Sequence, residues 1–142
     1  MQMPDEPNTP TGVKRDDRLI VAATVAIGVV HLVTAIWMVV APRSFFDTLA
    51  TFGVYNEHFQ YDLAAFEAGI GLALLAAAKW TSLRVGAVAT AFAVTTFHAV
   101  NHWFDINAAN DGSHADLFGA ASLTGLAIAT GWLLLAVRPT AA

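Results

Sequence analysis

The sequence contains no cysteine and little charge. Only 13 % of its 142 residues are Asp, Glu, Lys or Arg, whereas soluble domains carry roughly 25 %. Without cysteine the chain forms no disulfide and offers no thiolate to a metal or to CxxC redox chemistry. Lys and Arg together number 7, too few for a basic patch, so we expect no nucleic-acid partner.

Motifs for nucleophilic catalysis and for phosphate binding are also missing. No GxSxG segment occurs, and no histidine base stands at helical spacing from Ser44, Ser113 or Ser122. The glycines of "GIG" at 69–71 lack the GxGxxG pattern of nucleotide-binding loops and indicate helix packing instead. Serine hydrolase chemistry and nucleotide binding are therefore not expected.

Apolar residues dominate what is present. They make up 56 % of the chain, and the mean hydropathy is +0.57. Four runs reach the roughly 20 residues that a membrane-crossing helix needs, at about 19–40, 62–78, 83–104 and 117–137. The sequence predicts an all-α, polytopic bundle of four transmembrane helices over residues 19–138. Residues 1–18 form a polar leader that we expect to be a disordered cytoplasmic tail.

The basic residues predict an orientation in the lipid bilayer. Lys and Arg favour the cytoplasmic side of short loops. With four spans, every Lys and Arg except Arg43 falls on the same side of the membrane. These residues are Lys14, Arg15, Arg18, Lys79, Arg84 and Arg138. Both termini are therefore expected in the cytoplasm of a multi-pass cell-membrane protein, with loops 41–61 and 105–116 outside.

The histidines gather toward the outer side of this arrangement. In "FHAVNHWFD", His98 and His102 stand four residues apart and share a helix face. His31 lies about 13 Å from the outer end of the first span at 1.5 Å per residue. Glu67 lies roughly 7–8 Å into the second span by the same rise. Because a carboxylate is costly in hydrocarbon, Glu67 should face the bundle interior and a partner.

These residues predict an outward-facing pocket that binds a transition metal, for metal handling or a redox process. Imidazole and carboxylate ligands suit zinc, copper or iron. The candidate ligands are His98, His102, Glu67, His31, Asp62, His58 and Asp105. A haem held by His31 and His98 is an alternative, but it leaves the acidic residues of the pocket unexplained.

Two further hypotheses remain open. Chains of Asp, Glu and His inside a membrane also mark proton or ion relays without a fixed metal. Alternatively, the chain is a structural accessory subunit of a larger membrane complex or a homo-oligomer, with its buried polar groups joining helices through hydrogen bonds. Enzymatic activity is not decided by the sequence; a metal in the pocket could act on an extracytoplasmic or lipid-borne substrate.

The segment "FFDTLATFGVYNEHFQYDLAAFEAGIGLALLAAA" carries a resemblance to a known group. Its "FG" turn and its D-L-x-A helix start, at Phe52, Gly53, Asp62, Leu63 and Ala65, resemble the first loop and second span of small DoxX-like membrane proteins. The resemblance covers about a quarter of the chain. It implies a four-helix membrane bundle, sometimes associated with respiratory or redox complexes. The histidine-rich third span departs from the pattern, so no site residue is carried over.

Overall fold

The computed structural model describes residues 17–106 and 115–138. It forms helices α1 (Asp17–Val40), α2 (Pro42–Leu49), α3 (Glu57–Lys79), a short 3-10 helix η1 (Thr81–Leu83), α4 (Arg84–Phe104) and α5 (Ala115–Val137). The described residues contain no strand, which confirms the all-α class. Most of the expected N-terminal tail lies outside the described residues, whereas Asp17 and Arg18 belong to α1.

Four of these helices are long and apolar enough to cross a membrane: α1, α3, the segment Thr81–Phe104, and Leu117–Val137 within α5. They correspond to the four hydrophobic runs of the sequence. The helix α3 begins at Glu57 rather than at Asp62 because Asn56 caps it, its side-chain oxygen accepting a hydrogen bond from the Phe59 backbone N–H at 3.2 Å. The described chain is therefore helical, with four helices whose length and composition suit a membrane protein.

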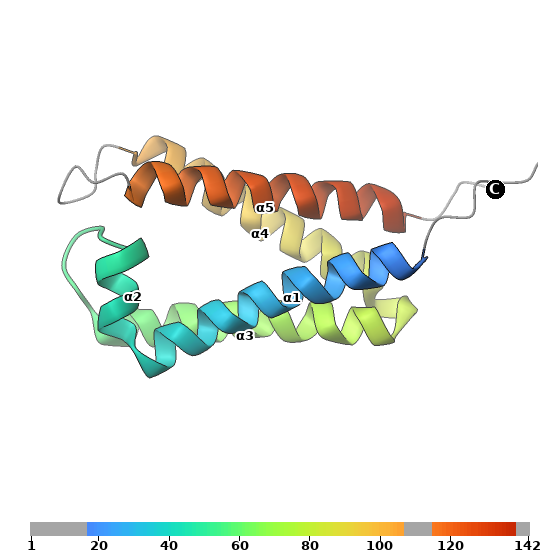
Figure 1. Cartoon of the computed structure of the whole chain (residues 1–142), viewed down its shortest axis with the longest axis horizontal. Helices are drawn as coiled ribbons and strands as arrows, with labels where there is room; N and C mark the ends of the chain where they lie inside the picture. Colours follow the sequence, from blue (N-terminus) through green and yellow to red (C-terminus); the bar gives the residue numbers. More distant parts are fainter. Residues whose placement is uncertain (1–16, 107–114, 139–142) are drawn as a thin grey trace, which may run out of the picture.

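The helix α2 lies in the stretch that the sequence analysis treated as a loop. Pro42 occupies its first turn, where proline needs no hydrogen-bond donor. Phe45 is buried against Ala35 and Met38 of α1 and Ala64 of α3. Figure 1 shows α2 lying across one end of the bundle, where α1 and α4 end and α3 and α5 begin. We call this the α2 end.

The long helices associate as two pairs, α1 with α3 and α4 with α5. Within a pair the contact is extensive, and between the pairs it is sparse. Figure 1 shows the pairs converging at the end opposite α2 and diverging toward the α2 end. At the converging end, a core that includes Ile20, Leu74, Val88 and Leu133 joins all four helices. The α2 end is therefore where the bundle has room for a site.

Glycine lets α1 approach α3. A Cβ added at Gly71 would lie 2.8 Å from the carbonyl oxygen of Gly28 and 2.7 Å from Cγ of Leu32. A Cβ at Gly28 would in turn lie 3.1 Å from the carbonyl oxygen of Gly71. Small residues of this kind bring transmembrane backbones into contact. The α1–α3 pair thus depends on these two glycines.

We expect Gly71→Ala to separate α1 from α3, because the added methyl group meets a backbone oxygen that cannot turn aside. Overpacking of this kind costs about 1–3 kcal/mol, measurable as a lower midpoint of thermal unfolding in detergent. The matched control is Gly69→Ala, two residues away, where an added Cβ meets nothing within 4 Å. Equal unfolding midpoints for the two variants would contradict the proposed close contact.

Candidate functional site

A cavity of about 770 Å³ lies between the two helix pairs at the α2 end. All five helices contribute to its lining, which is mostly apolar. Its titratable and amide side chains are His31, Gln60, Glu67, His98, Asn101 and His102. We call it the histidine cavity. The sequence-predicted residues that line it are His31, Glu67, His98 and His102.

The best defined polar contact in the cavity joins α1 to α3. Nδ1 of His31 and Oε2 of Glu67 lie 2.6 Å apart. An ionised carboxylate can only accept hydrogen bonds, so Nδ1 donates to it. The His31 residue is only 3 % exposed. The contact therefore fixes the orientation of a buried imidazole and leaves its second nitrogen, Nε2, for another partner.

His31 and Gln60, which both line the histidine cavity, each have a buried polar atom without a hydrogen-bond partner among the residues that the structure describes. These atoms are Nε2 of His31 and Oε1 of Gln60. An unsatisfied buried group costs about 1–3 kcal/mol. Such groups call for an explanation such as an ion, a ligand or a water molecule. The cavity thus offers unused hydrogen-bonding and ligating capacity.

The rings of His98 and His102 lie one helical turn apart on α4. Their centroids are 5.0 Å apart with planes inclined at 50°. The ring of Phe52 meets His102 edge-on, with centroids 5.2 Å apart. On the other side, a Cβ added at Gly119 of α5 would lie 3.1 Å from Nδ1 of His102. The ring of His102 is therefore confined by its neighbours, whereas His98 is exposed.

The remaining predicted ligands lie elsewhere. His58 and Asp62 face each other across 3.7 Å with side chains that are 86 % and 60 % exposed. Asp105 is the exposed residue that ends α4. None of these three lines the histidine cavity. The structure thus divides the seven predicted residues into four at the cavity and three outside it.

Helical register explains this division on α3. Gln60 is seven residues from Glu67, close to two full turns, so both face the cavity. Asp62 and His58 are five and nine residues from Glu67, nearly one and a half and two and a half turns, which places them on the opposite face. Depth in the membrane suggested Asp62 and His58 as ligands, but depth does not determine the face.

The part of the chain that the structure describes contains no ready-made metal-ligand group. Among residues 17–106 and 115–138, no set of three or more His, Cys, Asp or Glu side chains could hold a metal ion as placed. His31, His98 and His102 line one cavity, but as placed they do not form such a group. Metal binding stays a prediction.

Sequence reasoning missed Gln60 and the aromatic residues of α2. Gln60 is 2 % exposed, although the sequence analysis placed it in the first loop. Phe45 and Phe46 of α2 line the cavity. The signal for α2 was Pro42 followed by an amphipathic run. Its exposed side carries Arg43, whose pKa is raised chiefly by its hydrogen bond to Asp47.

We expect Glu67→Ala to destabilise the bundle, because Nδ1 of His31 loses its partner while staying buried. The expected loss is about 1–3 kcal/mol in the free energy of unfolding, measured by thermal or denaturant unfolding in detergent. Asp62→Ala on the same helix is the matched control, since exposed ion pairs contribute about 0–1 kcal/mol. A Glu67 variant as stable as the Asp62 variant would show that the buried contact contributes little.

Comparison with protein-family models, curated proteins and solved structures found no match to this chain. The resemblance carried by Phe52, Gly53, Asp62, Leu63 and Ala65 therefore rests on those residues alone. The candidate site has to be interpreted from its own geometry.

Proposed function

We propose that this chain is a multi-pass protein of the cell membrane, with both termini in the cytoplasm and the histidine cavity open to the outside. The distribution of positive charge supports this orientation. Lys79 and Arg84 flank η1 at the end opposite α2, close to where α1 begins and α5 ends. Arg43 lies at the α2 end. The α2 end then faces outward.

Within this arrangement, the histidine cavity binds a transition metal ion, with zinc, copper and iron as the candidates. The observation that carries this proposal is the buried Nε2 of His31, which lacks a partner in the described part of the chain while Nδ1 contacts Glu67. Metal-ligating histidines almost always donate their other ring N–H to a carboxylate, a carbonyl oxygen or water. The His31–Glu67 pair has this arrangement.

The other residues have defined tasks in this proposal. His98 and His102 supply two further imidazoles from the facing helix α4. Glu67 orients His31 and raises the basicity of its ring. The apolar side chains of the lining limit the access of water. A metal held by these imidazoles would supply Lewis-acid chemistry or, if it is copper or iron, redox chemistry.

A second candidate function is proton exchange without a metal. It is favoured by the 2.6 Å contact between His31 and Glu67. Histidine changes charge near neutral pH, and paired His and Glu side chains occur in proton relays within membranes. This function needs the same pair but no third ligand, so metal analysis separates the two candidates.

We expect the protein, purified without an affinity His tag, to bind about one equivalent of metal per chain in a titration followed by elemental mass spectrometry. His31→Ala should abolish this binding, and so should His98→Ala combined with His102→Ala. His58→Ala is the matched control, because His58 is exposed and outside the cavity. Glu67→Gln should weaken metal affinity by about 10–100-fold while sparing the ligands themselves.

Circular dichroism and membrane yield establish whether each variant still folds and inserts. A folded His31→Ala protein that retains its metal would overturn the assignment of Nε2. A wild-type protein that binds no metal in titration, but whose His31 titrates together with Glu67, would favour proton exchange instead.

A further inference from the structure

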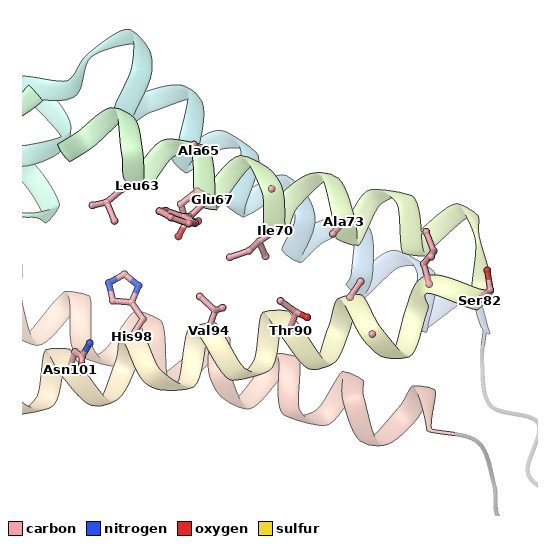
Figure 2. Close-up of a pocket in the computed structure, with 15 residues that line it drawn as sticks. Leu63, Ala65, Glu67, Ile70, Ala73, Ser82, Thr90, Val94, His98 and Asn101 are labelled. Atoms are coloured by element: carbon pink, nitrogen blue, oxygen red, sulfur yellow. The ribbon is translucent and has the colours of Figure 1, made fainter. Parts of the chain in front are cut away.

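A second hollow, of about 900 Å³, runs along the bundle between α3 and α4. Figure 2 shows its two walls, with Leu63, Glu67, Ile70 and Ala73 on α3 facing Thr90, Val94 and His98 on α4. We call it the lateral cleft. It adjoins the histidine cavity, because Leu63, Glu67, Val94, His98 and Asn101 line both hollows. A molecule lying in the cleft therefore reaches the cavity.

The glycines that line the cleft have open space beside them, unlike the glycines of the α1–α3 contact. An added Cβ at Gly69 or at Gly86 would meet nothing within 4 Å. These glycines therefore leave space between α3 and α4 instead of bringing the helices together. From Gly86 to Asn101 the cleft follows about 22 Å of α4 at 1.5 Å per residue, which is most of the roughly 30 Å hydrocarbon thickness of a bilayer. A long, narrow, apolar hollow of this length fits an extended aliphatic chain.

Charge restricts what the head of such a molecule can be. Of the described residues that line either hollow, none is Lys or Arg, and the lone carboxylate among them is Glu67. In the metal-free protein, a phosphate placed there would lose its hydration without gaining a cation. A neutral head group avoids this cost. The unpartnered Oε1 of Gln60, in a residue 2 % exposed, is an acceptor in the cavity that a hydroxyl group would satisfy.

We propose that the lateral cleft binds the chain of a neutral, hydroxyl-bearing amphiphile that enters sideways from the bilayer. Its chain lies between α3 and α4 along Gly69 and Gly86. Its hydroxyl group passes Glu67 and His98, enters the histidine cavity and donates a hydrogen bond to Gln60. The proposal goes beyond metal binding and does not require a metal to be present, so either can fail without the other.

Photo-crosslinking in phosphatidylcholine nanodiscs tests the position of the chain. The probe is hexadecanol with a diazirine near the methyl end of its chain, and labelled residues are mapped by mass spectrometry. Labelling should concentrate on residues 69–73 of α3 and 86–90 of α4. An added Cβ at Gly69 or Gly86 meets nothing within 4 Å, so Gly69→Leu and Gly86→Leu should extend into the cleft and each reduce labelling about tenfold. Ala93→Leu, at an exposed position of α4 outside both hollows, should leave it unchanged.

Competition tests the head group in the same assay, with metal-free protein. Hexadecanol should displace the probe about tenfold better than hexadecyl phosphate does. Gln60→Leu should remove this advantage while leaving the chain in the cleft. Even labelling of all lipid-facing helix surfaces, or labelling that the leucine variants do not reduce, would overturn the chain site. Equal or better competition by hexadecyl phosphate would overturn the neutral head group.

Discussion

The hydrogen bond between His31 and Glu67 is the constraint on which the account of this protein depends. A glutamate within a hydrocarbon-spanning helix is costly unless it has a partner, and a histidine of α1 lies 2.6 Å away. The contact ties α1 to α3 and satisfies one nitrogen of a buried ring. The same contact sets the orientation in which Nε2 of His31 is presented. The same pair of side chains therefore both joins α1 to α3 and orients the nitrogen that we propose as a metal ligand.

Small residues divide the bundle into a closed part and an open part. Gly28 and Gly71 bring α1 and α3 into backbone contact, whereas Gly69 and Gly86 face open space between α3 and α4. The apolar core holds the four long helices together at the end opposite α2. The histidine cavity lies where the helix pairs diverge, and the lateral cleft runs from it along α3 and α4 toward η1, with Glu67 and His98 lining both hollows. The candidate site therefore lies where the helix pairs are no longer closely packed against each other.

Much of the fold could be predicted from the sequence, because hydropathy and helix length determine it. Four apolar runs correspond to the four spanning helices. The spacing of His98 and His102, four residues apart on one helix, and the cost of an unpaired Glu67 drew attention to side chains that line one cavity. These inferences rest on local geometry and on the energetics of burial, which a sequence can report.

The rest could not be predicted because it depends on helix starts and helix faces. With α3 assumed to begin at Asp62, Gln60 looked like a loop residue, and His58 looked like a neighbour of the pocket. The Asn56 cap moves the start to Glu57, which buries Gln60 and turns His58 and Asp62 to the opposite face. The lateral cleft depends on how α3 and α4, which belong to different helix pairs, are placed relative to each other. The residue pattern of a single helix does not show this placement.

Nitrogen-15 NMR of the His31 side chain during a zinc titration tests the central claim most directly. With Glu67 accepting from Nδ1, we expect the Nδ1 resonance to stay that of a hydrogen-bonded N–H. The Nε2 resonance should shift as zinc is added and stop shifting at about one equivalent. An Nε2 resonance that does not respond to zinc, in protein whose His31 and Glu67 are still in contact, would contradict the claim that this nitrogen is a metal ligand.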